Sequence, residues 1–291
     1  MSENASEKTG EAPRYPDGTN YALSYFRTEA EALHLAFSED GVNWNAANDN
    51  KPILTGTVGC KTLRDPFVFA DNHGLYHLLA TNGWRSDSIV HAVSENLTDW
   101  GEQKLLPVMA SQPNVRNCWA PECFFDAEAG LYRLIWSSSL TEPNGAADWN
   151  HRIWSASTED FSAFSPAQLF FDPGYSVIDA TVIAWRGGYL MAFKDERGEN
   201  EPSTAFKAIR VCFAESGAGP YREISELITP PLTEGPTLFQ RGAELVLLFD
   251  HFMENKFGAV HSTDSKNWSP LNETLRLPSG VRHANVITLS K

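Results

Sequence analysis

The sequence contains no long apolar run and no excess of basic residues, and these absences exclude several classes of protein. Its longest apolar stretches resemble Leu245–Phe249, whereas a membrane span needs about 18 consecutive apolar residues. The 23 basic and 37 acidic side chains give a net charge of −14, while binding to nucleic acid or to anionic lipid requires a basic surface. We therefore expect neither nucleic acid nor a membrane as a partner.

Cysteine is scarce, and several common catalytic signatures are missing. The four cysteines, Cys60, Cys118, Cys123 and Cys212, form no CxxC pair, so neither a zinc ribbon nor a thioredoxin-type site is predicted. We expect all four to be buried or half-buried thiols. The sequence has no GxSxG, HExxH or Walker motif and no complete GxGxxG, which argues against the chemistries that depend on those motifs.

The chain is long enough to form a stable core without metal ions or disulfides. At 291 residues, a single domain buries roughly three quarters of its unfolded surface. Residues 1–18 are polar and lack the apolar segment of a signal peptide. We expect a disordered tail over 1–18, one domain over 19–291 and, as the sequence is written, a cytoplasmic protein. Removal of an export signal would make it secreted or periplasmic.

A short motif recurs at regular intervals along the chain. Each copy begins at Ser or Ala, continues through acidic or amide residues, and ends on an aromatic residue six or seven positions later. The fourth copy is degenerate. The five copies are Ser38–Trp44, Ser94–Trp100, Ser157–Phe164, Ala214–Tyr221 and Ser262–Trp268.

A second repeat lies between these copies and is predicted to form β-hairpins. Each unit starts with a short polar motif and continues as two runs of aromatic and β-branched residues joined by a turn, as hairpins do. The four units are Asp65–Ala80, Glu122–Trp136, Asp179–Phe193 and Glu234–Phe249. No stretch of 12 or more residues has a convincing helical period. Repeats of about 40 to 60 residues that contain about four strands each are typical of propeller blades.

The two repeats together predict an all-β fold, a five-bladed β-propeller. Tyr21–Phe26 and Leu33–Phe37 form the fifth hairpin, and we expect His283–Leu289 to add the innermost strand of the same blade. Pairing the N- and C-terminal strands in one blade closes the ring and removes an exposed sheet edge. A sandwich of two sheets is the alternative architecture, and the regular spacing favours the ring.

Residues that open the inner strands of a propeller point toward its central channel. The predicted openers are Asp65, Glu122, Asp179, Glu234 and His283. Four carboxylates at equivalent repeat positions would meet near one axis, where repulsion and desolvation raise some of their pKa values. Hydrolysis of glycosidic bonds needs such groups, one protonated and one ionised. Alternatively, an acidic residue before a strand caps a turn or faces solvent, and for Glu122 both substrate contact and a structural anchor remain open.

Four short segments occur in an order and at a spacing that resemble those of a known family. They are Arg64–Pro66, Trp119–Glu122, Val177–Thr181 and Thr233–Pro236. The set resembles the blade motifs of glycoside hydrolase family 43, five-bladed propeller enzymes that remove arabinofuranosyl or xylosyl units. The resemblance extends from about Tyr21 to Leu289.

This resemblance implies hydrolysis with inversion by three acidic residues. Asp65 resembles the general base, Asp179 the acid that modulates pKa and orientation, and Glu234 the general acid. An inverting mechanism then requires the carboxyl groups of Asp65 and Glu234 to lie ~6.5–9.5 Å apart, which leaves room for the attacking water. No cofactor is required for this chemistry.

His283 resembles a channel histidine that, in many members of this family, faces a central metal ion, often calcium, largely through water. A structural Ca²⁺ in the central channel is therefore one expectation, and a histidine hydrogen-bonded inside the channel is the other. The sequence also departs from the family pattern: Asp179-Ala180-Thr181 replaces the common Asp-Pro-Ser, and Glu122 stands where Asp is common. A hairpin precedes the base. We expect no accessory β-sandwich after the propeller, which weakens the interpretation as a xylosidase.

Aromatic and basic residues near these motifs are candidates for substrate binding. We expect Trp84, Trp119 and Trp149 to stack on sugar rings. Arg64 and Arg282 would hydrogen-bond sugar hydroxyls or pair with the channel acids. The tryptophans of the first repeat are instead expected to pack between blades: Trp44, Trp100 and Trp268.

These observations predict an inverting, exo-acting glycoside hydrolase that releases terminal furanosyl units, above all α-L-arabinofuranosyl, from plant-type polysaccharides or oligosaccharides. Long segments at 139–151 and 194–207 are expected to rise over the channel and form a pocket, which favours release of single sugars. The alternatives are a β-xylosidase or β-galactofuranosidase, a retaining fructosidase-like enzyme, and a non-catalytic carbohydrate-binding propeller. The oligomeric state is left open.

Overall fold

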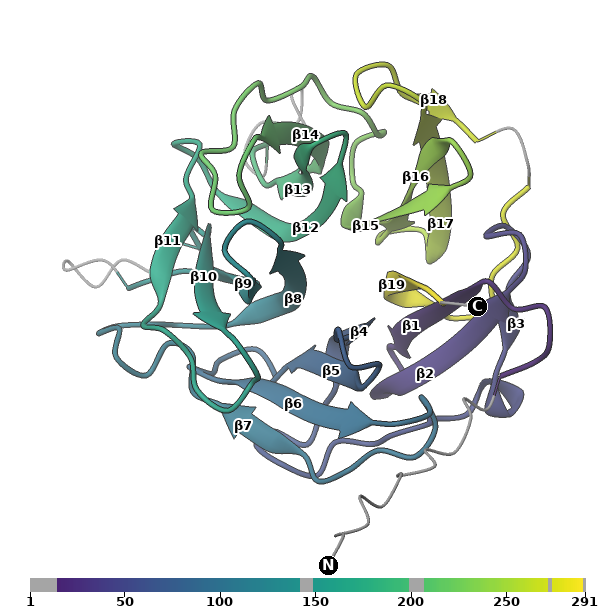
Figure 1. Cartoon of the computed structure of the whole chain (residues 1–291), viewed down its shortest axis with the longest axis horizontal. Helices are drawn as coiled ribbons and strands as arrows, with labels where there is room; N and C mark the ends of the chain where they lie inside the picture. Colours follow the sequence, from purple (N-terminus) through teal and green to yellow (C-terminus); the bar gives the residue numbers. More distant parts are fainter. Residues whose placement is uncertain (1–14, 142–148, 199–206, 272–273, 290–291) are drawn as a thin grey trace, which may run out of the picture.

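The computed structural model shows a ring of five antiparallel sheets around a central channel (Figure 1). It describes residues 15–141, 149–198, 207–271 and 274–289. Within these ranges the regular structure is β-strand apart from one short 3₁₀ helix, η1 (Asn48–Asn50), and no helix has the length and hydropathy of a membrane span. The predicted five-bladed β-propeller is confirmed, and the alternative of a two-sheet sandwich is wrong.

The five sheets are the blades of the propeller. In chain order the strands are β1 (Tyr21–Arg27), β2 (Ala30–Ser38), β3 (Asn45–Ala46), β4 (Arg64–Ala70), β5 (Tyr76–Thr81), β6 (Ile89–Ser94), β7 (Lys104–Leu106), β8 (Trp119–Asp126), β9 (Leu131–Ser138), β10 (Arg152–Thr158), β11 (Gln168–Phe171), β12 (Val177–Trp185), β13 (Gly188–Asp195), β14 (Ala208–Ala214), β15 (Glu234–Arg241), β16 (Glu244–His251), β17 (Lys256–Ser262), β18 (Ser269–Pro270) and β19 (Arg282–Thr288). Blade 1 has the order β19-β1-β2-β3, blade 2 β4-β5-β6-β7, blade 3 β8-β9-β10-β11, blade 4 β12-β13-β14 and blade 5 β15-β16-β17-β18. The first strand named in each blade is the innermost, because these five strands contact one another around the channel.

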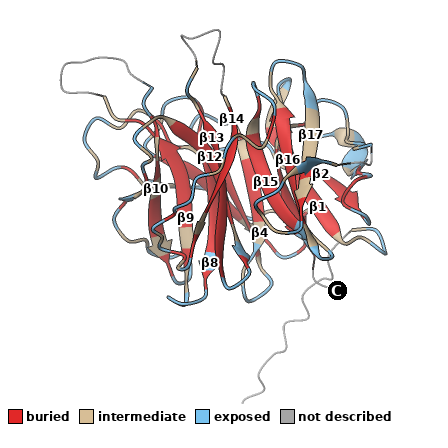
Figure 2. Cartoon of the chain, turned by 90° about the horizontal axis from the view of Figure 1, so that it is seen from above, coloured by how far each residue is buried: buried red, intermediate tan, exposed pale blue. Residues whose placement is uncertain are grey.

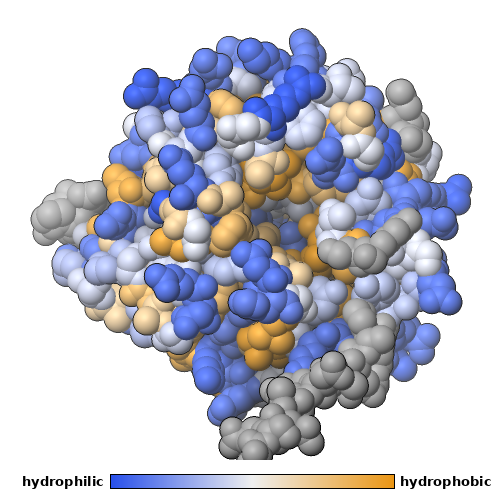
Figure 3. Space-filling view, viewed as in Figure 1, coloured by the Kyte–Doolittle hydropathy of each residue, from blue (hydrophilic) through white to orange (hydrophobic). Residues whose placement is uncertain are grey.

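Blade 1 joins the two ends of the chain. Its innermost strand, β19, pairs antiparallel with β1, from Thr288 opposite Tyr21 to Arg282 opposite Phe26. The C-terminal strand thus takes the innermost place, as predicted. Backbone hydrogen bonds between the chain ends close the ring, whose centre is a hollow bordered by hydrophobic residues (Figure 3).

Blade 4 departs from the four-stranded pattern. Among the described residues it has three strands, and an irregular segment covers its outer edge, β14. Arg222 exchanges two backbone hydrogen bonds with Phe213, and the Ser225 N–H donates to the Val211 carbonyl. The degenerate fourth copy of the first repeat, Ala214–Tyr221, lies between β14 and this covering segment.

Hydrophobic residues fill the spaces between neighbouring blades. Successive residues of a strand point to opposite faces of its sheet, so Leu78 packs between blades 1 and 2 while Leu79 packs between blades 2 and 3. Leu247 and Leu248 of β16 pack in the same way on either side of blade 5. Both faces of each sheet are buried (Figure 2). The second strand of each blade, counted outward from the channel, is therefore a continuous apolar run in the sequence.

The first repeat forms the turn that follows the third strand of a blade. Asp40 Oδ1 accepts the backbone N–H groups of Val42 and Asn43 at 2.8 Å each, and Asp264 accepts two backbone N–H groups in the same way in blade 5. These side chains take the place of backbone acceptors in the turn. As predicted, Trp44 at the end of the motif is buried and packs between blades 1 and 5.

All four cysteines are free thiols. Cys118, Cys123 and Cys212 are buried, as expected. Cys60 is exposed, so the expectation that it is buried or half-buried is wrong. It lies in the loop before β4, where the chain runs over the surface.

Replacing Asp40 with Ala tests the contribution of the turn to stability. Burial alone would raise the pKa of Asp40, but hydrogen bonds from Asn43 and Val42 outweigh it and lower the pKa to about 2. The stabilisation is therefore present above the unfolded-state pKa of about 4 and is lost as the pH falls toward 2. We expect Asp40→Ala to lower the free energy of unfolding by about 1 kcal/mol at pH 7, and by less at pH 3, in urea denaturation. Substitution of the exposed neighbour Glu39 by Ala is the control, and an equal loss from both variants would contradict the account.

Candidate active site

A β-bulge interrupts the beginning of every inner strand. In β4 the pairing with β5 jumps from Arg64 to Phe67 and leaves two residues unpaired, and the other four inner strands show the same shift. The first unpaired residue has a positive φ in all five strands: Asp65 (48°), Ala120 (45°), Asp179 (55°), Gly235 (55°) and His283 (40°). Asp and His are among the side chains that tolerate this region best after glycine, so the backbone accounts for four of the five residue types found there, and Ala120 is the exception.

The bulges also correct the predicted equivalence of the inner-strand residues. Three of the five predicted residues share the first bulge position: Asp65, Asp179 and His283. Glu234 precedes the bulge of β15 by one residue, and Glu122 follows Ala120 by two. The prediction that all five residues occupy one repeat position is therefore wrong. The number of residues between repeats does not show which residue of each strand is left unpaired in the bulge.

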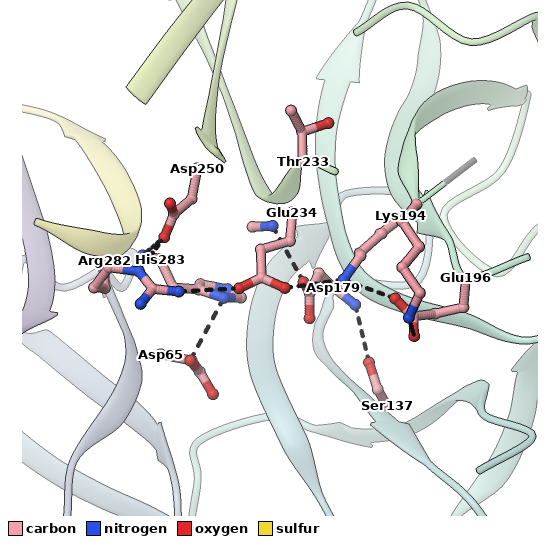
Figure 4. Close-up of polar contacts among 12 residues, drawn as sticks. Asp65, Ser137, Asp179, Lys194, Glu196, Thr233, Glu234, Asp250, Arg282 and His283 are labelled. Carbon is pink, nitrogen blue, oxygen red and sulfur yellow. Dashed lines mark hydrogen bonds and ion pairs between the residues drawn. The ribbon is translucent and has the colours of Figure 1, made fainter. Parts of the chain in front are cut away.

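Hydroxyl groups of the preceding blade hold the bulges and orient their side chains. Thr81, at the end of β5, accepts the Ala120 N–H at 2.8 Å and donates its hydroxyl proton to Asp65 Oδ2 at 2.6 Å. One hydroxyl therefore positions both the carboxylate of β4 and the bulge of β8. In the next blade, Ser137 Oγ accepts the N–H of Asp179 at 3.1 Å (Figure 4).

Asp179 is buried beside Glu234. Its Oδ2 accepts the Gly235 N–H at 3.1 Å, which places the carboxyl against the first residue of the neighbouring bulge. Burial raises the pKa of Asp179 to about 6, with His283 opposing the shift and the charge of Glu234 adding to it. Strongly shifted carboxyl groups of this kind are concentrated at functional sites.

Two cations hold the carboxylate of Glu234 (Figure 4). Lys194 Nζ lies 2.9 Å from Oε2, and Arg282 Nη2 lies 3.4 Å from Oε1. Each cation contacts a second carboxylate, since Lys194 pairs with Glu196 at 2.7 Å and Arg282 Nε pairs with Asp250 at 2.6 Å. Of the two roles expected for Arg282, the structure thus shows the pairing with channel acids.

His283 lies beside the predicted base. Its Nδ1 is 3.5 Å from Asp65 Oδ1. Burial lowers the pKa of His283, but the charges of Asp65 and Asp179 outweigh it and raise the pKa overall. Calcium prefers about six to eight oxygen ligands, and in the described ranges no group of three or more His, Cys, Asp or Glu side chains is placed to hold a metal ion. The residues around His283 do not fit a calcium ion held by protein ligands.

Glu122 is buried two residues beyond the bulge position of β8. Only 7% of its surface is exposed. Burial raises the pKa of Glu122 well above its ordinary range; a hydrogen bond with Thr181 opposes the increase, and the charge of Asp179 adds to it. A buried carboxyl beside Thr181 of the neighbouring blade suits the expected anchor between blades 3 and 4. The substrate contact expected of Glu122 stays a prediction.

Tryptophan side chains cluster beside the strand that carries the predicted base. Trp84 and Trp119 meet edge to face at 5.4 Å, and Trp119 stacks on Trp149 at 5.2 Å. Arg64 lies over Trp84 at 5.1 Å and pairs with Glu31 at 2.5 Å. The structure therefore brings together the predicted sugar-binding residues of blades 2 and 3, and Trp84, with 63% of its surface exposed, is the most accessible of them.

Sequence reasoning missed a set of polar residues at the end of the second strands. They stand opposite the residue before the bulge in blades 2 to 5: Thr81, Ser137, Lys194 and Asp250. Each of them follows a largely apolar run, as at Phe193-Lys194 and Phe249-Asp250. This recurring polar ending is the signal that could have found them. Glu196 lies outside the repeat, and no sequence pattern indicates its contact with Lys194.

The chain matches a family model of glycosyl hydrolase 43-related domains, described as "Probable glycosyl hydrolase domain", over residues 17–291. It is 26% identical over 260 residues to an α-L-arabinofuranosidase of Bifidobacterium longum, an alignment that covers 78% of this chain and 23% of that protein. The chain thus spans about a quarter of the length of this curated relative.

Solved structures of similar fold include a thermostable family-43 glycoside hydrolase, with a TM-score of 0.62, 19% identity, and coverage of 79% of this chain and 80% of the other. An α-L-arabinofuranosidase from Lactobacillus brevis has a TM-score of 0.58, 14% identity, and coverage of 77% and 74%. An arabinanase from Bacillus subtilis has a TM-score of 0.57, 15% identity, and coverage of 81% and 88%. At these identities the likeness shows the fold.

Thr81→Val tests whether one hydroxyl links two blades at the site. Valine keeps the shape of threonine but leaves the buried Ala120 N–H without its acceptor, so we expect a loss of about 1–3 kcal/mol in the free energy of unfolding. Thr81→Ser keeps the hydroxyl and should lose much less. Urea denaturation of both variants measures this difference, and equal stabilities would contradict the assigned role.

Proposed function

Because the chain belongs to the family of glycosyl hydrolase 43-related domains, we propose that it is an inverting, exo-acting enzyme that releases terminal furanosyl units, above all α-L-arabinofuranosyl, from plant-type polysaccharides or oligosaccharides. The predicted family and the enzyme class, a glycoside hydrolase, are confirmed at the level of the family. The sugar, the exo mode of action and the roles of individual residues are the proposal.

The observation that carries the proposal is the placement of Asp65 and Glu234 on blades that are not neighbours. Blade 1 lies between them and supplies consecutive residues to each, since His283 Nδ1 is 3.5 Å from Asp65 and Arg282 Nη2 is 3.4 Å from Glu234. Two carboxylates held on different sides of a channel suit a base and an acid that act on opposite faces of one sugar. Their predicted separation of ~6.5–9.5 Å remains part of the proposal.

The proposed reaction uses Asp65 and Glu234 in one concerted step. Asp65, oriented by the hydroxyl of Thr81, accepts a proton from a water molecule, whose oxygen attacks the anomeric carbon. The bond from that carbon to the leaving oxygen breaks, and Glu234 donates its proton to this oxygen. Asp179 lies beside Glu234 through its bond with Gly235, and its negative charge favours the protonated form of Glu234.

The aromatic cluster supports a carbohydrate substrate. Sugars present C–H faces that pack on aromatic rings, and ligand sites combine such surfaces with a few placed polar groups. Trp84 and Trp119 supply the rings, and Arg64, which lies over Trp84, supplies donors for hydroxyl groups. The α-L-arabinofuranosyl choice is supported by the relative from Bifidobacterium longum that carries this name.

The segments expected to cover the channel are only partly described. Residues 142–148 and 199–206 of those segments lie outside the described residues. The pocket that would restrict the enzyme to terminal sugars therefore stays part of the proposal, and product analysis on a linear oligosaccharide tests it. Release of single sugars alone is expected, and internal cleavage would contradict exo action.

Replacing each of the two proposed catalytic carboxyl groups with an amide tests their assigned roles as base and acid. We expect Asp65→Asn and Glu234→Gln each to lower kcat by about 10²–10⁴-fold on an arabinofuranosyl oligosaccharide. With p-nitrophenyl α-L-arabinofuranoside, Glu234→Gln should lose much less, because this leaving group needs little protonation, whereas Asp65→Asn should remain impaired. Glu39→Gln is the control for a surface change.

Near wild-type turnover by both variants would show that the assignment is wrong. p-Nitrophenyl β-D-xylopyranoside and β-D-galactofuranoside, assayed with the wild-type chain, test the alternative sugars. Binding of these ligands without any turnover would instead indicate a non-catalytic carbohydrate-binding propeller.

A further inference from the structure

A buried lysine contacts the proposed general acid. Lys194 is the residue of β13 that pairs with Ile178 just before the bulge of β12, and its side chain is 4% exposed. Its Nζ lies 2.9 Å from Glu234 Oε2 and 2.7 Å from Glu196 Oε1 (Figure 4). The strand position opposite the residue before the bulge therefore places an ammonium group at Glu234.

The contact has a chemical consequence. A cation within 4 Å of a carboxyl group favours its ionised form, whereas a general acid must hold a proton when the substrate is bound. Burial strengthens this effect, because the charges are screened less than at the surface. Lys194 thus acts against the protonation of Glu234, and Asp179 acts in favour of it.

The negative charge of Glu196 offsets part of the positive charge of Lys194. It contacts Lys194 through Oε1 and Lys207 through Oε2, at 2.7 and 3.3 Å. The result is a row of alternating charges, Glu234, Lys194, Glu196 and Lys207, that runs from the proposed general acid to the segment before β14. Any change in the charge of Glu196 alters how much of the Lys194 charge acts on Glu234.

We propose that Lys194 is a positioning residue that sets the pH at which Glu234 loses its catalytic proton. Glu196 raises this pH by offsetting part of the positive charge of Lys194. The inference rests on the proposed role of Glu234 as general acid. It assigns a second element of control over that acid, in addition to Asp179.

Other titratable or charged groups also face Glu234, Lys194 or Glu196 and stay in place in the variants below. They are Asp179 of β12, Asp250 of β16, Arg282 and His283 of β19, and His151, which precedes β10. The Phe252 ring also lies 4.6 Å from Lys194 Nζ. Because these groups are common to the wild type and the variants, the difference between them isolates Lys194 and Glu196.

The two substitutions have opposite expected signs. Lys194→Met removes the cation, so Glu234 keeps its proton to higher pH, and the alkaline limb of the kcat/KM profile moves up by about 1 pH unit or more. Glu196→Gln removes the negative charge that offsets Lys194, so Lys194 acts more strongly on Glu234 and the alkaline limb moves to lower pH. Lys194→Arg keeps the charge and should return the limb toward its wild-type position. General damage to the fold does not produce shifts of opposite sign.

The test is the pH dependence of kcat/KM for the full chain and these three variants. The substrate is phenyl α-L-arabinofuranoside, whose leaving group needs a proton, and p-nitrophenyl α-L-arabinofuranoside is the comparison, with a smaller dependence on Glu234. An alkaline limb that stays in place in both Lys194→Met and Glu196→Gln, or that moves in the same direction in both, would overturn the inference.

Failure of the inference and failure of the proposed function give different results. A wild-type chain that turns over no glycoside refutes the proposed function, and the inference falls with it. An active wild type with unmoved alkaline limbs refutes the inference alone. If circular dichroism shows that Lys194→Met does not fold, Glu196→Gln decides, because it retains Lys194 and changes a single oxygen to an amide nitrogen.

Discussion

The bulge at the beginning of each inner strand is the constraint on which the site depends. It turns one residue per blade out of the β-ladder at positive φ, and it leaves backbone N–H groups that need acceptors. Thr81 and Ser137 supply these acceptors from the preceding blades. Fold and site are therefore not separable here, because the same hydrogen bonds that join neighbouring blades also set the direction of Asp65 and the position of Asp179.

Charge compensation is the second requirement of the site. Several carboxylates near one channel are stable only if cations or protons offset them. Lys194 and Arg282 provide positive charge next to Glu234, and the charges of Asp65 and Asp179 raise the pKa of His283 beside Asp65. Burial raises the pKa of Glu122 well above its ordinary range and so favours its protonated form. Burial also raises the pKa of Asp179, to about 6, but leaves this group ionised at neutral pH. The same balance that permits so many acids at one place also determines which of them holds a proton, and this is what acid–base catalysis uses.

Much of the fold could be predicted from the sequence because both repeats have a physical origin. The apolar second strands are buried on both faces, and Asp-containing turns follow the third strands. Each of these features therefore recurs in the sequence once per blade. The motifs also single out Asp65, Asp179 and Glu234, and the structure gathers these three side chains around His283. The sequence could not show the bulge register, so Glu122 was given a position that belongs to Ala120. Nor could it show Lys194 beside Glu234, because that contact joins two blades and depends on how the sheets pack.

The central claim is that Asp65 and Glu234 act from opposite faces of one sugar, with a water molecule between the base and the anomeric carbon. The stereochemistry of the first product tests this most directly. Proton NMR of the wild-type chain acting on p-nitrophenyl α-L-arabinofuranoside follows the anomeric signal before mutarotation. The account predicts that β-L-arabinose appears first, and first appearance of the α-anomer would contradict it.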